Sequence, residues 1–268
     1  MNSFKQRIEA FKEVLSALKI KSRVIFALVL RETRTTFGNS SLGYVWAILT
    51  PAIGVALLVV IFAFASRQPP FGQSLALFFA TGFLSYEYYN KLANSLMTVI
   101  DANKALLLYP VVTPTAAICA RFILISITYL LIMFIFYGTL VLFGLADLPA
   151  YPIQLLWAFF TIGLLGLGVG VFNCSMIIFW DSWRQIFQII NRPLFFISGI
   201  FFIPSLLPER ALGFLKWNPV LHLIEWVRTS YYPNYDSRVL DKIYVLSIAF
   251  ILIALGLLGE RYFRNKRS

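Results

Sequence analysis

The sequence predicts an all-α polytopic membrane protein, and its composition and its hydropathy pattern are the observations that predict it. Hydrophobic residues make up 59% of the 268 residues and charged residues only 13%, with a mean hydropathy of +0.78. Too few polar side chains are therefore present to cover a water-soluble globule. Runs of about 20 apolar residues, the length that crosses roughly 30 Å of hydrocarbon, recur along the chain. We expect six transmembrane helices, at approximately 42–65, 74–90, 116–143, 153–180, 185–204 and 243–260.

The residues before the first span, 1–41, predict helices at the cytoplasmic membrane surface. Over residues 4–19, apolar residues recur every three or four positions and charged residues occupy the other faces, which is typical of an amphipathic helix in the headgroup plane. The alternative is a helix that packs on a soluble partner. A break near Lys21 and Ser22 should separate it from a second interface helix at roughly 23–37.

Two of the expected spans are unusual. The span at 74–90 is short, and the span at 185–204 contains Asn191-Arg192-Pro193, where proline should cause a kink. An arginine as deep as Arg192 costs on the order of 3 kcal/mol unless it meets water, phosphate or a partner. We expect Arg192 to face a conduit; the alternative is that it reaches the inner headgroups from a kinked helix. Arg121 is closer to a helix start and is expected to reach the headgroups in that way.

Basic residues flank the apolar region and predict that both termini are cytoplasmic. They are frequent in residues 1–41 and again in the tail, 261–268. The net charge of +11 is therefore better explained by membrane topology and anionic lipid than by nucleic acid. Six spans then place the segments 66–73, 144–152 and 205–242 outside. The last segment is long and aromatic, so about 205–240 should form re-entrant helices between the last two spans.

The sequence offers no recognisable catalytic or metal site, which predicts a protein that is not an enzyme and that binds no cofactor itself. It lacks the Gly-Lys dipeptide of a nucleotide-binding P-loop. The glycine-rich run from Gly163 to Gly170 lies in an apolar span, where small residues let helices approach closely. One histidine, His222, and two cysteines, Cys119 and Cys174, cannot make a metal cluster, and we expect the cysteines to be small apolar core residues.

Three stretches resemble one family of export proteins. The first runs from Arg31 through Phe37-Gly38 and Leu42-Gly43-Tyr44-Val45-Trp46 to Pro51. The second contains Ala102-Asn103, Leu106, Tyr109-Pro110-Val111 and Pro114, and the third contains Trp217-Asn218-Pro219, His222 and Glu225 followed by Pro233-Asn234-Tyr235. With them the chain resembles the inner-membrane permeases of capsular polysaccharide export ABC transporters (KpsM type), a branch of the ABC-2 family with the type V exporter fold. One departure is Thr36, where that family usually has a basic residue.

The resemblance implies a transport subunit of the bacterial inner membrane that forms a homodimer with two separate ATPase subunits, which would bind ATP and Mg. It implies a coupling helix at about 99–114 that inserts into the ATPase, and we expect a second contact between the fourth and fifth spans. The residues expected to couple to the ATPase are Arg31, Glu32, Arg34, Asp101, Asn103, Leu106, Tyr109, Pro110, Pro114, Trp183 and Arg184.

The resemblance also implies the cargo, an acidic lipid-linked polysaccharide, with periplasmic and outer-membrane capsule export proteins as further partners. Aromatic rings suit sliding contacts with sugars, because their faces meet C–H groups. The residues expected along the substrate path are Tyr44, Trp46, Tyr86, Tyr88, Arg192, Trp217, Asn218, His222, Glu225 and Tyr231. We also expect contacts with membrane lipids and none with nucleic acid.

The sequence leaves two alternative functions open. An ABC-2 exporter of another glycan, O antigen or teichoic acid, would have every feature above. A membrane-embedded transferase would instead need acidic residues or histidine converging in a cavity.

Overall fold

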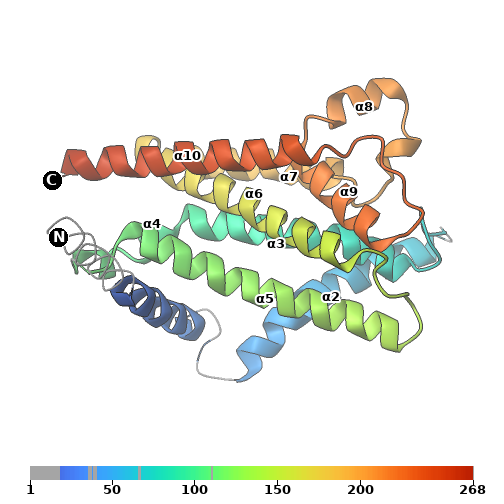
Figure 1. The fold of residues 1–268 in the computed structure, drawn as a ribbon, viewed down its shortest axis with the longest axis horizontal. Coiled ribbons are helices and arrows are strands. Elements are labelled where there is room, and N and C mark those ends of the chain that lie inside the picture. Colours follow the sequence, from blue (N-terminus) through green and yellow to red (C-terminus); the bar gives the residue numbers. More distant parts are fainter. Residues whose placement is uncertain (1–18, 36–37, 39–40, 66–67, 110, 268) are drawn as a thin grey trace, which may run out of the picture.

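The computed structural model describes residues 19–35, 38, 41–65, 68–109 and 111–267, which form an elongated bundle of helices (Figure 1). Residues 19–35 are the first described helix. It is followed by α2 (Ser41–Phe64), α3 (Leu75–Met97), α4 (Val99–Ala102), the 3₁₀ helix η1 (Leu106–Leu108), α5 (Pro114–Leu142), α6 (Pro152–Phe179), α7 (Trp183–Ile197), the 3₁₀ helix η2 (Pro204–Leu206), α8 (Glu209–Leu215), α9 (Pro219–Tyr231) and α10 (Lys242–Arg267). These described residues contain no β-strand, so the predicted all-α class is confirmed.

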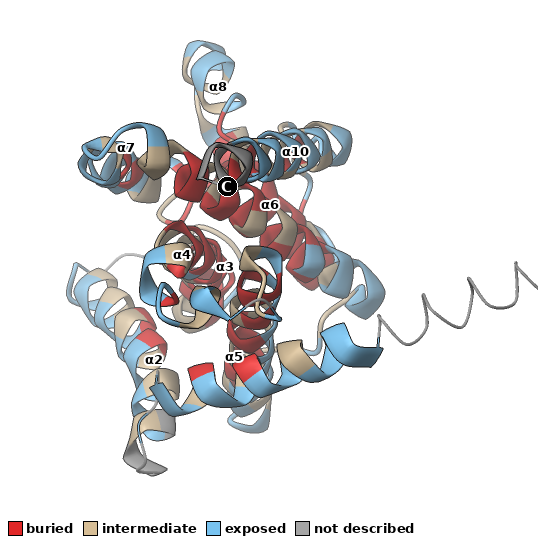
Figure 2. Ribbon diagram, turned by 90° about the vertical axis from the view of Figure 1, so that its left-hand side faces the viewer, coloured by how far each residue is buried: buried red, intermediate tan, exposed pale blue. Residues whose placement is uncertain are grey.

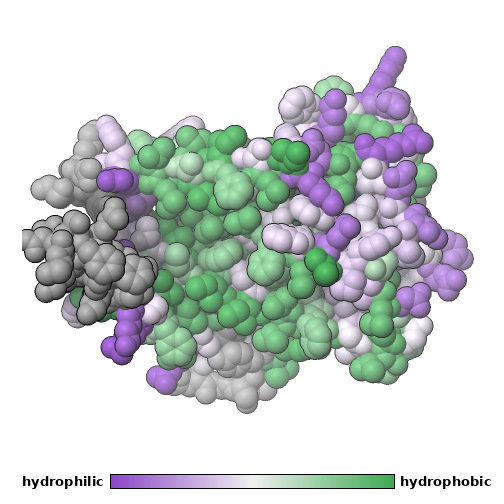
Figure 3. All heavy atoms as spheres, viewed as in Figure 1, coloured by the Kyte–Doolittle hydropathy of each residue, from purple (hydrophilic) through white to green (hydrophobic). Residues whose placement is uncertain are grey.

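Four described helices are long and apolar enough to cross a membrane: Val45–Phe64 in α2, Pro114–Leu142 in α5, Pro152–Phe179 in α6 and Lys242–Tyr262 in α10. They match four of the expected spans. Helix α3 has 23 residues but carries polar and charged side chains, and α7 has only 15 residues, about 22 Å at 1.5 Å per residue. The expectation of six spans therefore stays a prediction. On the face shown in Figure 3, a broad apolar band lies between more polar ends.

Helices α3 and α6 form the centre of the bundle, where the buried residues concentrate (Figure 2). The glycines of α6 permit this packing. A Cβ atom at Gly166 would lie 2.8 Å from Leu92 Cβ of α3, and one at Gly170 would lie 2.6 Å from Leu96 Cβ. These distances are too short for any larger residue, which confirms that the glycine-rich run serves close helix packing.

The bundle has two ends, which we name by the helices found there. The α4 end holds α4 and the last turns of α10, and the α9 end lies opposite, with α8 and the turn between α5 and α6 (Figure 1). At the α9 end, the backbone N–H groups of Ala150 and Tyr151 donate to the carbonyls of Tyr231 and Ser230, and the ring of Phe71 packs 5.2 Å from that of Tyr232. The three segments expected on one side of the membrane therefore do meet at one end of the molecule.

Three local expectations need correction. Residues 19–35 are one continuous helix, so the break expected at Lys21 and Ser22 is wrong; the Ser22 hydroxyl donates to the Lys19 carbonyl within it. The segment 99–114 is not one helix but α4, a turn and η1. The helix expected at 185–204 ends at Ile197, before Gly199 adopts a φ of 83°. Most of the amphipathic helix expected at 4–19 lies outside the described residues.

Candidate functional site

A polar network joins helix 19–35 to the segment after α3 and to α5 at the α4 end. The guanidinium of Arg31 donates to Asn103 Oδ1 at 2.7 Å, and Asn103 Nδ2 donates to Glu32 Oε1 at 3.3 Å and to the Val99 carbonyl at 2.9 Å. Arg121 Nη2 lies 2.6 Å from the same Glu32 oxygen. Asn103 and Glu32, both predicted to couple to the ATPase, therefore face inward and connect elements of this chain.

The Glu32–Arg121 ion pair is the buried centre of this network. The two side chains are only 8% and 12% exposed, and Arg121 also donates to the Ser95 carbonyl at 3.1 Å. Removing one partner of a buried pair leaves an uncompensated charge and costs about 3–5 kcal/mol. The expectation that Arg121 reaches the headgroups is wrong, because Glu32 and the end of α3 hold its guanidinium.

Three of the apolar residues exposed at the α4 end are at the tip of the loop between α4 and α5, and others, such as Trp180, are in the loop between α6 and α7. Leu108 is 85% exposed and Tyr109 64%, and Val111 is exposed as well. We call these three residues the coupling tip. Leu106, also predicted to couple to the ATPase, is partly buried and packs against the small cluster formed by Leu28, Ala116 and Ala120. Its coupling role stays a prediction. Pro110 lies outside the described residues, and Pro114 is the first residue of α5.

A second loop, between α6 and α7, contacts the base of this segment. Arg184 lies 3.3 Å from Asp101, which also pairs with Lys104 at 3.0 Å. Trp183 Nε1 donates to Asn173 Oδ1 of α6 at 2.9 Å, which orients the start of α7. Exposed pairs of this kind add about 0–1 kcal/mol, so their role is to set geometry more than stability. Of the other predicted coupling residues, Arg34 is exposed in the last turn of helix 19–35.

A row of amide side chains lies between α3 and α7, and sequence reasoning missed it. Gln188 donates to Asn94 Oδ1 at 2.6 Å, and Asn191 donates to Asn90 Oδ1 at 2.6 Å. Asn94 also donates to Asn90 Oδ1 at 2.6 Å, so the four side chains form one chain of hydrogen bonds, which we call the amide strip. Asn90 precedes the end of α3 by seven residues, roughly 10 Å along the helix. The sequence does place Asn90 and Asn94 one helical turn apart in an apolar segment, which indicates a polar contact there. Their partners on α7 are known only from the packing of the two helices.

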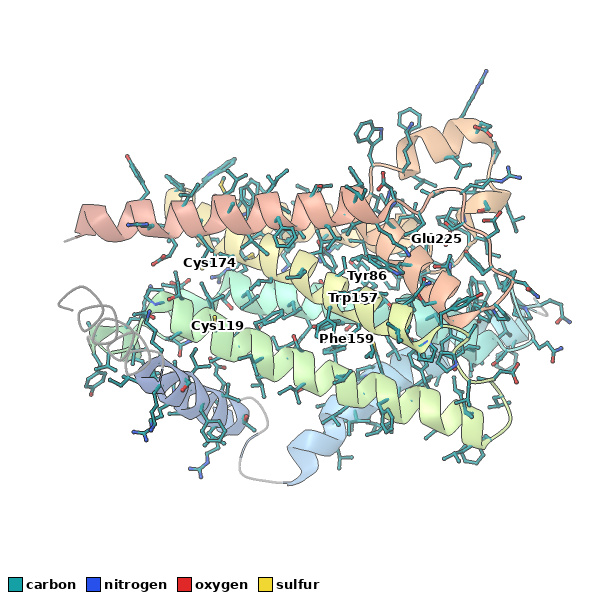
Figure 4. All side chains as sticks on the ribbon, viewed as in Figure 1. Tyr86, Cys119, Trp157, Phe159, Cys174 and Glu225 are labelled. Atoms are coloured by element: carbon teal, nitrogen blue, oxygen red, sulfur yellow. The ribbon has the colours of Figure 1, made fainter. Side chains whose placement is uncertain are left out.

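Arg192 follows the amide strip on α7 and is exposed. In this chain its side chain thus lies at the surface of α7, and the conduit role stays a prediction. Tyr86 is buried beside it: its hydroxyl donates to the Asn191 carbonyl at 2.9 Å, and its ring packs 5.1 Å from Phe195 (Figure 4). The strip therefore continues into an aromatic cluster toward the middle of the bundle.

Several predicted path residues hold the α9 end together. The Asn218 side chain caps α9 by accepting from Val220 N at 3.0 Å. His222 Nδ1 accepts from Asp241 N at 3.0 Å, and Nε2 contacts the Lys216 carbonyl at 2.7 Å. This pattern fits neutral imidazole with its hydrogen on Nε2. Both ring nitrogens are thus occupied, so His222 is not available as a base.

Glu225, in the middle of α9 (Figure 4), belongs to a buried charged cluster. It accepts from the Tyr235 hydroxyl and from Ser237, each at 2.6 Å. Burial, and then the neighbouring Glu225 carboxylate, raise the pKa of Tyr235, so this phenol keeps its proton and remains a donor. Arg228 lies 3.8 Å from Glu225 and donates to the Gly199 carbonyl at 2.7 Å. This cluster joins α9 to the segment that follows α7.

The remaining predicted path residues divide by exposure. Trp46 and Trp217 are exposed, whereas Tyr88 and Tyr231 are buried and donate to Ser126 and to the Asp147 carbonyl. The side chain of Tyr44 is outside the described part. The path role of this whole set stays a prediction.

Cysteine and metal chemistry add no site. Cys174 is buried as expected, but Cys119 is exposed on α5, so its assignment to the core is wrong. Within the described residues, histidine, cysteine, aspartate and glutamate do not gather into a group of three that could hold a metal ion.

The model of the family described as "ABC-2 type transporter" matches residues 23–232. The chain is 28% identical to the polysialic acid transport protein KpsM of Escherichia coli over 246 residues, which cover 90% of this chain and 94% of that protein.

Two further relatives have similar coverage. The capsule polysaccharide export inner-membrane protein CtrC of Neisseria meningitidis serogroup A is 26% identical over 91% of this chain and 92% of its own length. The corresponding protein BexB of Haemophilus influenzae is 26% identical over 89% and 91%.

Proposed function

The chain belongs to the ABC-2 type transporter family of membrane proteins, and we propose that it is the permease subunit of a bacterial inner-membrane exporter of capsular polysaccharide. The substrate class follows from the names of the relatives, which the chain matches over nearly its whole length. The structural observation that carries the proposal is the coupling tip, an exposed apolar surface on a loop whose base is held by hydrogen bonds and ion pairs. An exposed apolar surface of this kind is typical of a binding site for another protein.

We propose that the coupling tip binds a separate ATPase subunit, which holds the ATP and Mg. The base of the tip is attached to helix 19–35 and α5 through the Asn103–Glu32–Arg121 network, and to α7 through Asp101 and Arg184. A force applied to Tyr109 would therefore reach three helices at once. The ATPase would supply the energy, and this chain would convert it into helix movement.

We propose that two copies of the chain form the conduit around a two-fold axis. The amide strip is partly open at the surface of the single chain, at a depth that an apolar bilayer would otherwise cover. Unsatisfied amide groups in hydrocarbon cost several kcal/mol each, so this surface needs water or a protein partner. A second copy facing α3 and α7 would enclose the strip in a polar path.

The amide strip and Arg192 suit a hydroxyl-rich acidic polymer. Amide side chains both donate and accept hydrogen bonds, as sugar hydroxyls require, and a guanidinium binds carboxylate or phosphate. The polymer would move from the α4 end, which we assign to the cytoplasm with both termini, to the α9 end. There, re-entrant helices α8 and α9 would meet the periplasmic and outer-membrane export proteins. In this arrangement α3 and α7 complete the six spans.

A membrane-embedded transferase needs acidic residues or histidine that line one cavity. Glu209, His222 and Asp241 line one cavity of the described part, and Glu32 and Glu87 line another, but the bonding of these groups argues against catalysis. The best candidate base, His222, is bonded through both nitrogens, and Glu32 is paired with Arg121. An exporter of O antigen or teichoic acid differs only in cargo, so an export assay with chemical identification of the polymer separates it from our proposal.

The test of the function combines copurification with an Arg192 series. An ATPase should copurify with the tagged chain, and failure to recover one from a host that assembles the polymer would contradict the proposal. At equal expression, Arg192→Lys should export polymer at a reduced rate, whereas Arg192→Ala and Arg192→Glu should impair export and substrate-stimulated ATP hydrolysis. Arg261→Glu, at an exposed position toward the end of α10, is the matched control and should export normally. Normal export by Arg192→Glu would exclude Arg192 as a residue of the substrate path.

A further inference from the structure

A cavity adjacent to the amide strip lies between helix 19–35, α2, α3 and α5. Its volume is about 410 Å³, within the range of small-ligand sites. Glu32 and Arg121 line one side, Thr50 and Pro51 of α2 another, and α3 contributes Glu87, Lys91 and Ser95. The amide strip, in contrast, lies between α3 and α7.

The cavity contains two charges for which the described residues offer no ion pair shorter than 4.0 Å. Arg121 is neutralised by Glu32 at 2.6 Å. Glu87 and Lys91 are one helical turn apart, line the cavity and attract each other, and the Asn90 side chain hydrogen-bonds to Glu87. Within the described residues, however, neither Glu87 nor Lys91 has an opposite charge within 4.0 Å. Glu87 is ten residues from the end of α3, roughly 15 Å, so this carboxylate lies deep in the apolar band. Ionisable groups at that depth are costly and need a compensating partner.

The helices beside the cavity indicate what kind of ligand can reach it. On α2, Leu49 and Ile53 are exposed, and on α5, Ile127 and Leu131 are exposed. These apolar surfaces are of the kind that acyl chains cover. A ligand that enters between them would have an apolar tail and a polar head.

We propose that this cavity binds the headgroup of a zwitterionic phospholipid of the phosphatidylethanolamine type. The lipid phosphate would pair with Lys91 and the primary ammonium with Glu87, so each unpaired charge gains its complement and the site remains neutral. An anionic headgroup would satisfy Lys91 and leave Glu87 unpaired. A trimethylated choline headgroup has no N–H donor for the carboxylate. The bound lipid would seal the space between α2 and α5 above the Glu32–Arg121 pair.

Native mass spectrometry of the purified full-length chain tests the proposal, with phosphatidylethanolamine, phosphatidylcholine and phosphatidylglycerol of identical acyl chains as probes. Phosphatidylethanolamine should be retained most strongly. Glu87→Gln and Lys91→Gln should each weaken its retention about tenfold, the effect of losing one charge-assisted hydrogen bond. In Glu87→Gln the advantage over phosphatidylcholine should disappear.

The controls separate a lost site from a lost fold. Lys104→Gln removes an exposed lysine outside the cavity and should leave lipid retention unchanged, and Glu87→Asp and Lys91→Arg preserve the charges and should retain the preference. Equal or stronger retention of phosphatidylglycerol by the parent would overturn the proposal. Retention of phosphatidylethanolamine that neither Gln variant alters would overturn it as well.

Discussion

Replacing Glu32 with glutamine should loosen helix 19–35 from the rest of the molecule. The substitution preserves the shape of the side chain but removes the charge that lies 2.6 Å from Arg121. Because the two side chains are only 8% and 12% exposed, water can replace the lost charge only in part. Leaving one buried charge unpaired costs about 3–5 kcal/mol, and the partial exposure of Arg121 favours the lower end.

This cost should appear as local opening of helix 19–35. A loss of about 3 kcal/mol corresponds to roughly a 150-fold increase in the population of the undocked helix. Hydrogen exchange followed by mass spectrometry should report faster exchange in peptides that cover helix 19–35, with α6 unchanged. The double variant Glu32→Gln with Arg121→Met removes both charges at similar side-chain length and should recover most of the protection.

Glu209→Gln is the matched control for this experiment. Glu209 is exposed at the start of α8, and the described residues give it no ion pair, so the exchange of helix 19–35 should not change. Exchange in Glu32→Gln within about twofold of the parent would refute the reasoning, because the pair would then contribute almost nothing to docking.

Three further predictions follow from separate features. Tyr109→Glu should abolish export and ATPase binding at normal expression. Tyr151→Glu, at an exposed position of the opposite end, should change neither. Normal copurification of the ATPase with Tyr109→Glu would exclude the coupling tip as the ATPase-binding surface. Gly170→Val should lower stability by about 1–3 kcal/mol in thermal unfolding, because a Cβ there lies 2.6 Å from Leu96, while Gly138→Ala meets no neighbour and should be tolerated. A cysteine at Asn234 should react with an impermeant thiol reagent added to intact cells, after Cys119 has been replaced by serine; its failure to react would reverse the proposed topology.

The sequence by itself determined the class of the protein and much of its architecture. Helices α2, α5, α6 and α10 follow from local composition, because the length and hydropathy of a segment decide whether it can cross a bilayer. The grouping of three loops at the α9 end was predicted from the six expected spans, which include those at 74–90 and 185–204. The role of the α6 glycines was also predictable, because in an apolar helix small residues have few uses other than close packing.

Only the tertiary structure decided which polar groups meet. Glu32 and Arg121 are 89 positions apart, and Asn90 and Asn191 are 101 positions apart, so their pairing depends on which helix faces pack together. The same reason explains the wrong expectation for Arg121, whose guanidinium pairs with Glu32 of helix 19–35. Hydropathy is a property of one segment. A buried hydrogen bond joins two segments, and which two segments meet is decided only by the folded structure.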